Sequence, residues 1–161
     1  MNIIKKTIIT TVGKMSRPMI LSTFVTIGDL SKALYKKNGK EALPIITEVA
    51  SKTGSERAKM MQGIMPVKGM KDFIELFMMM DSIMGMGIEI IESSDEVFHF
   101  TMPKCIGGIE GTSKELCEAV MTSDKNTISN LLGQAVEMKI LKSVAVGDKN
   151  CEVIFSIESK K

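Results

Sequence analysis

Residues 69–103, GMKDFIELFMMMDSIMGMGIEIIESSDEVFHFTMP, contain two hydrophobic periods in succession. Up to Gly85, apolar side chains recur every three or four residues, which predicts an amphipathic helix. After Gly87, apolar and polar residues alternate on both sides of the turn-forming residues 93–95, which predicts a β-hairpin. The core face of the second strand would carry Phe98, Phe100 and Met102. This stretch therefore predicts a helix followed by an antiparallel hairpin.

The segments before this stretch predict strands and then helices. Residues 2–12 and 18–27 are rich in β-branched side chains, which favours a pair of strands. Asp29 would cap a helix that ends at Asn38-Gly39. Two further helices are predicted over 44–54, with Pro44 in the first turn, and over 55–66.

The segments after it predict two short helices and a closing hairpin. Thr112 and Glu115 would form a capping box for the first helix. Ser123 or Asp124 would cap the second, which would end at Gly133. The turn at 147–150 separates an apolar run from a strand that begins at Cys151. We predict an α+β fold, with helices packed on a small antiparallel sheet built from C-terminal hairpins.

Composition excludes several classes of protein. The 161 residues carry a net charge of +2, with 21 basic and 19 acidic residues spread along the chain. No block of like charges marks a nucleic-acid-binding arm, and no continuous apolar segment marks a signal peptide or membrane span. We expect a cytoplasmic protein in which residues 1–161 form a single domain, with no direct nucleic-acid or membrane partner.

Methionine is unusually abundant, with 15 residues against one tyrosine and no tryptophan. Flexible, polarizable methionine side chains fill irregular cores and also line surfaces that accept varied apolar ligands. The stripe on the helix at 70–84 is typical of core packing, and part of it would line a pocket against the hairpin. The residues that we expect around an apolar ligand are Phe73, Phe77, Met80, Met84, Phe98 and Phe100.

The three cysteines, Cys105, Cys117 and Cys151, form an odd count that favours reduced thiols over a disulfide framework. Their spacing matches no zinc finger or ribbon. Alternate residues of the last strand share a face, so Cys151 should point inward. The three thiols could still converge on one metal ion, with the fourth ligand supplied by Glu115, Glu118 or His99.

An enzyme is the alternative. His99 is the single histidine and could activate one of the cysteines as a nucleophile. The loop CIGGIEG at 105–111 follows a strand and precedes a helix, but it lacks the phosphate-binding pattern and no nucleotide-cofactor fingerprint is visible. We interpret this loop as a flexible segment that could act as a lid over an apolar ligand.

The C-terminal half resembles the 4-vinyl reductase domain, a predicted hydrocarbon-binding domain. The resemblance rests on FHFTMPKCIGG, KELCEAV, ISNLLGQAVEM and KSVAVGDKNCEVIFSIE, and weaker similarity extends it to residues 29–158. It implies an α+β fold shared with ligand-binding domains of nitric-oxide signalling and with a Golgi tethering subunit. It also implies a homodimer that holds a small hydrocarbon-like or aromatic molecule in an internal pocket.

The same resemblance implies a structural zinc ion. In aromatic-sensing regulators of this family, the metal is bound by cysteines matching Cys117 and Cys151 and by an acidic residue and a cysteine upstream of the latter. Ile140 and Ser143 stand at those two upstream positions here. A zinc site would therefore need Cys105, together with Glu115 or Glu118. The resemblance also leaves open a hydrolase of thiazoline carboxylates, a vinyl reductase or a structural subunit.

Overall fold

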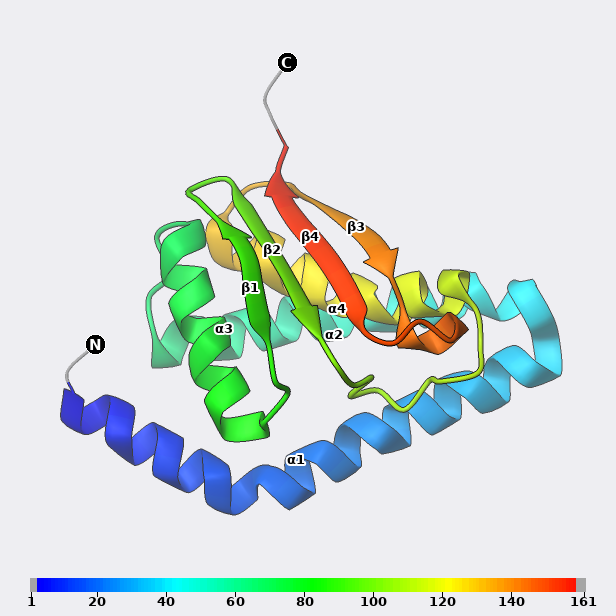
Figure 1. Ribbon diagram of the computed structural model, residues 1–161, viewed down its shortest axis with the longest axis horizontal. Coiled ribbons are helices and arrows are strands. Elements are labelled where there is room, and N and C mark those ends of the chain that lie inside the picture. The colour runs from blue at the N-terminus through cyan, green and yellow to red at the C-terminus, as the bar shows by residue number, and fades with distance from the viewer. Residues whose placement is uncertain (1–2, 159–161) are drawn as a thin grey trace.

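The computed structural model describes residues 3–158, so the first residue of the predicted strand at 2–12 lies outside the described part of the chain. These residues form four α-helices and one four-stranded sheet (Figure 1). In chain order the elements are α1 (Ile3–Asn38), η1 (Gly39–Ala42), α2 (Leu43–Ile64), α3 (Met70–Met84), β1 (Glu89–Ser93), β2 (Val97–Met102), α4 (Lys114–Leu132), β3 (Val136–Lys142), η2 (Val144–Val146) and β4 (Cys151–Ile157).

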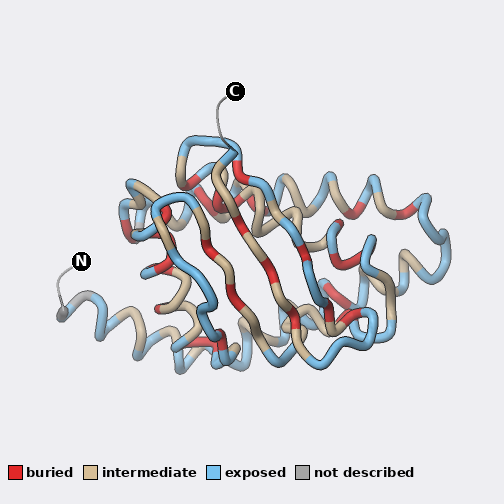
Figure 2. Tube along the Cα trace, turned by 45° about the horizontal axis from the view of Figure 1, so that its top comes forward, coloured by how far each residue is buried: buried red, intermediate tan, exposed pale blue. Residues whose placement is uncertain are grey.

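The sheet joins two antiparallel pairs in the order β1-β2-β4-β3. Strands β2 and β4 are central and pair with Phe98 opposite Phe155 and Phe100 opposite Val153. Buried and partly exposed residues alternate along both strands (Figure 2). This alternation gives the sheet one apolar face, as the period-two pattern predicts.

Helices pack against that apolar face. Side chains of α3 and α4 join those of β2, β3 and β4 in the main hydrophobic core, and α2 runs alongside α4 behind the sheet (Figure 1). The predicted α+β class, with helices on a small antiparallel sheet, is confirmed. None of the helices described in residues 3–158 combines the length and apolar character needed to cross a bilayer.

The predicted strands at 2–12 and 18–27 are wrong, because all the described residues of both segments belong to the single helix α1. The threonines of α1 are accommodated because their hydroxyls donate hydrogen bonds to backbone carbonyls one turn earlier in the helix. Thr23 donates to the Met19 carbonyl, and Thr26 donates to the Ser22 carbonyl. Pro18 lies inside α1, which bends in this region (Figure 1). Packing of α1 against the rest of the fold overrides the local preference for strand.

Two predicted helix breaks are also wrong. Helix α2 continues through Gly54. Glycine is required at this position because α4 approaches closely, and a Cβ atom on Gly54 would lie 2.3 Å from the Ser123 carbonyl oxygen. Helix α4 likewise continues through 123–124. Asp124 does not cap a new helix but binds Arg57 of α2, with 2.7 Å between the carboxylate and the guanidinium. Both residues serve the contact between α2 and α4.

The start of α4 and the closing hairpin differ from prediction in detail. Ser113, not Thr112, caps α4 by accepting a hydrogen bond from the Leu116 amide. The predicted partner Glu115 pairs instead with Lys40 of η1. The apolar run at 144–146 forms the short helix η2, and the outer strand of the hairpin is β3.

Candidate functional site

Five phenylalanines form a continuous cluster between α3 and the sheet. Phe73 and Phe77 come from α3, Phe98 and Phe100 from β2, and Phe155 from β4. Neighbouring ring centroids lie 4.7–6.2 Å apart in stacked, tilted and edge-on arrangements. Such pairs contribute about 0.5–1.5 kcal/mol each beyond the burial of their area. The cluster is therefore a cohesive aromatic layer under the central strands.

The structure brings together four of the six predicted ligand-binding residues, namely Phe73, Phe77, Phe98 and Phe100. Phe77 is half-buried and the other three are almost completely buried. Met80 is half-buried and Met84 is buried, but neither joins the side chains of the main core. Phe155 was not predicted as a site residue, although its alternation with Cys151 and Val153 on β4 marks it as inward-facing.

An open groove of about 340 Å³ lies on α3 next to the start of α1. Its lining residues are Lys6, Ile74, Glu75, Met78, Met79 and Ser82. Ile74 and Met79 also belong to the main core, and Met78 packs against that core. Side chains of the main core therefore form part of the lining of this groove. Sequence analysis missed it because α1 was predicted to be strands.

A second buried cluster joins α4 to the connection between β3 and β4. Cys117, Cys151 and Ser143 are each less than 5% exposed. The Ser143 hydroxyl donates to the Cys117 sulfur over 3.3 Å and accepts from the Ala145 amide over 3.2 Å. The Val144 amide donates to the Cys151 sulfur over 3.5 Å. Residues 117, 143 and 151 therefore meet, although they are far apart in sequence.

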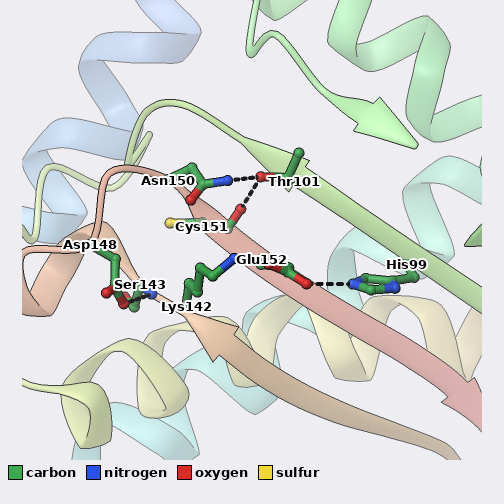
Figure 3. Close-up of polar contacts among 8 residues, drawn as sticks. All are labelled: His99, Thr101, Lys142, Ser143, Asp148, Asn150, Cys151 and Glu152. Atoms are coloured by element: carbon green, nitrogen blue, oxygen red, sulfur yellow. Dashed lines mark hydrogen bonds and ion pairs between the residues drawn. The ribbon is translucent and has the colours of Figure 1, made fainter. Parts of the chain in front are cut away.

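The backbone around this cluster is fixed by polar contacts at the end of the hairpin (Figure 3). The Asp148 carboxylate accepts from the Ser143 amide over 2.8 Å. The Thr101 hydroxyl donates to the Cys151 carbonyl over 2.8 Å and is itself bonded by Asn150. The bond between Asp148 and Ser143 therefore holds together the two ends of the connection between β3 and β4.

Burial keeps the thiols neutral. It raises the pKa of Cys117 to about 11, although the hydrogen bond from Ser143 acts in the opposite direction. Burial also raises the pKa of Cys151. Unfavourable interactions with the other cysteines add to the increase in the pKa of Cys117 and of Cys151. A neutral thiol is neither a strong nucleophile nor a metal ligand.

The donor set does not fit the zinc site that the resemblance implies. Ile140 is buried and brings a hydrocarbon side chain, and Ser143 brings a hydroxyl that is already hydrogen-bonded. Glu115 does not face the thiols but binds Lys40 over 2.9 Å, and this contact lowers the pKa of Glu115 to about 2. Across residues 3–158, no three His, Cys, Asp or Glu side chains are arranged to hold a metal ion.

His99 lies on the opposite face of the sheet from the buried thiols of α4 and β4. Its Nε2 atom is 3.0 Å from a carboxylate oxygen of Glu152, and Lys142 binds the other oxygen of that carboxylate over 2.6 Å (Figure 3). The bonds from Lys142 and His99 lower the pKa of Glu152. His99 is therefore hydrogen-bonded to Glu152 and is turned away from Cys117 and Cys151.

The glycine-rich loop at 105–111 is packed against α1. A Cβ atom on Gly28 would lie 1.5 Å from the Gly107 carbonyl oxygen, so only glycine permits this approach. The Lys32 ammonium donates to the Gly108 carbonyl over 3.1 Å. Ile109 is buried in the core. The loop that was predicted to be a flexible lid is thus held against α1 at Gly107 and Gly108.

Comparisons with known proteins give a likeness of fold. No protein-family profile matches the chain, and no curated protein matches its sequence. Solved structures do match, among them the crystal structure of the phenol-responsive sensory domain of the transcription activator PoxR with phenol. The two are 18% identical, and the match covers 83% of this chain and 74% of that one with a TM-score of 0.56. The chain therefore shares its fold with a small-molecule sensory domain, while the 4-vinyl reductase family stays a prediction.

Proposed function

We propose that this domain binds a small apolar molecule, hydrocarbon-like or aromatic, and acts as a sensory module. The aromatic cluster between α3 and the sheet is the observation that carries the proposal, because stacked and edge-on rings are the surroundings that an aromatic ligand prefers. The likeness in fold to a domain solved with phenol supports the same ligand class.

The binding residues would be the aromatic cluster and the methionines of α3. Phe77 is the half-buried member of the cluster and contacts Phe73, Phe98 and Phe100. Met78, the next residue, lines the open groove. A ligand would enter along this groove and displace these two flexible or partly exposed side chains. Methionine suits such an entrance because its unbranched chain changes rotamer at little cost.

Burial of the ligand would supply the driving force. Removal of apolar surface from water contributes about 25 cal/mol per Å² before the cost of association is subtracted. The ring contacts that the ligand makes would replace some of those lost when Phe77 moves. No reactive residue is needed for binding of this kind, in agreement with the raised pKa of Cys117.

Native mass spectrometry of the purified chain tests the proposal, followed by thermal unfolding with and without added phenol. We expect a co-purified apolar compound or a rise in the unfolding midpoint with phenol concentration. Met78→Gln should weaken the response because it places an amide in the groove, whereas Met60→Gln, on an exposed part of α2, should not. A chain that carries no compound and responds to no apolar or aromatic probe would contradict the proposal.

Three finer predictions accompany this function. The cysteine-bound zinc would need Cys105, Cys117, Cys151 and a carboxylate to rearrange, and elemental analysis of protein purified without added metal tests it. A homodimer is proposed as the working assembly, in the cytoplasm.

A small hydrolase or reductase is the alternative function. It requires a reactive thiolate, and the raised pKa values of Cys117 and Cys151 oppose the formation of one.

A further inference from the structure

The first half of α1 presents an apolar stripe to the outside of the molecule. Ile8, Val12, Met15 and Met19 follow one another at intervals of four, three and four residues and are each 56–79% exposed. Exposed apolar side chains scattered singly need no explanation, but a continuous row of large ones marks a contact surface.

The opposite side of the same helical segment packs against the protein. Ile9 packs against the main core, and a Cβ atom on Gly13 would lie 2.8 Å from the Ile83 side chain of α3. Helix α1 packs against α3 near the C-terminal end of α3 (Figure 1). The segment is therefore apolar on two opposite sides, and a helix of that kind is normally buried on both.

The spacing of the stripe is that of a coiled-coil seam. Intervals of four, three and four residues place the four side chains at successive a and d positions of a heptad. The flanking e and g positions are occupied by Ile9, Thr11, Ser16 and Pro18, which carry no charge. The basic side chains Lys14 and Arg17 fall outside the seam, and Arg17 lies against Gly85 at the end of α3. No like charges would therefore oppose the approach of an identical helix.

The stripe is also complementary to itself. If two copies of α1 cross antiparallel about an axis between Gly13 and Lys14, Ile8 lies against Met19 of the partner subunit and Val12 lies against Met15 of the partner subunit. Each exposed apolar side chain then meets another one. We infer that a second copy of this chain covers the stripe by forming an antiparallel pair of α1 helices.

The area of the stripe sets the expected strength of this contact. Four side chains of this exposure present on the order of 500 Å² per copy, below the roughly 800 Å² of a standard specific interface. The pair should therefore be a reversible dimer that dissociates on dilution. This inference rests on the two-copy assembly of the proposed function and assigns its surface, but it does not depend on ligand binding.

Sedimentation velocity of the full chain over a wide range of concentrations tests the inference. The wild-type chain should shift from monomer to dimer as concentration rises. Met15→Glu should remain monomeric, since it places a charge beside Val12 of the partner subunit. Met60→Glu makes the same change at a comparably exposed methionine of α2 and should dimerise like wild type. Because both sites are exposed, circular dichroism and phenol-dependent unfolding should be unchanged in both variants when they are measured at a concentration at which wild type is monomeric.

Cysteine cross-linking tests the register. A mixture of Val12→Cys and Met15→Cys chains should form a disulfide-linked dimer faster than either variant alone.

A wild-type chain that stays monomeric at the highest concentration, or a Met15→Glu chain that dimerises normally, would overturn the inference. So would a monomeric chain that floats with anionic lipid vesicles through α1, since its stripe would then cover a membrane surface. Preferential cross-linking of each variant with itself would overturn the antiparallel register.

Discussion

Replacement of Phe77 by alanine should destabilise the fold and create a site that phenol can fill. The Phe77 ring lies 5.3–5.6 Å from the rings of Phe73, Phe98 and Phe100. A fully buried Phe→Ala change costs about 3–5 kcal/mol, and Phe77 is half-buried. We therefore expect a loss of about 3 kcal/mol, which leaves a domain of ordinary stability folded. An apolar cavity of about 150 Å³ is sufficient for benzene.

Urea unfolding with and without phenol measures both effects. A ligand at a hundred times its dissociation constant stabilises the native state by about 2.7 kcal/mol, so phenol should restore most of the loss. Phe24→Ala is the matched control, because Phe24 is a half-buried ring on α1 that contacts Arg57 and lies outside the cluster. Phe24→Ala should lose stability without a comparable gain from phenol. Equal responses of the two variants, or none in Phe77→Ala, would refute the assignment of the cluster as an aromatic site.

Three other predictions concern helix packing, the thiols and the surface ion pairs. Gly54→Ala should lower the free energy of unfolding by about 1–3 kcal/mol, because its Cβ atom would clash with α4. Gly63 has open space around it, so Gly63→Ala should raise the free energy of unfolding by up to about 1 kcal/mol. Equal urea midpoints for the two variants would contradict this prediction. Because the pKa of Cys117 is about 11, only about one part in a thousand of this thiol is ionised near pH 8. Cys117 should therefore react with iodoacetamide far more slowly in the native chain than in the unfolded chain. Rapid labelling of the native chain would favour the enzyme alternative. Because the pKa of Glu152 is lowered in the folded state, its carboxylate stabilises the fold above the ordinary pKa of 4.5 and loses this contribution as the pH falls. The stability advantage of wild type over Glu152→Gln should therefore shrink between about pH 6 and pH 3, and a pH-independent difference would contradict the ion-pair assignment.

The parts of the fold that sequence predicted correctly are those with a strong local period. The three- and four-residue spacing of Phe73 and Phe77 identified α3, and the alternation around Phe98 and Phe100 identified the first hairpin. Alternation from Cys151 onward also gave the inward face of β4. In each case the period of the pattern matches the geometry of the element, so the inward face follows from sequence alone.

The parts that failed depend on contacts between distant segments. Local composition at 2–12 and 18–27 favours strands, but packing against α3 and the glycine loop makes residues 3–27 part of a helix. Gly54 and Asp124 look like helix boundaries in sequence, yet each serves the tight pairing of α2 with α4. Tertiary packing can outweigh a local preference of this kind because each such preference is worth about 1 kcal/mol or less.

The sequence by itself determined the fold class, the aromatic face of the sheet and the buried position of Cys151. Only the tertiary structure decided that Ser143 joins Cys117 and Cys151, that Glu115 turns to Lys40, and that α1 exposes an apolar stripe. Periodicity fixes which side of an element faces inward, since it follows from bond geometry within that element. Which residues meet there depends on how the elements are placed relative to one another, and that is determined by the packing of the whole chain.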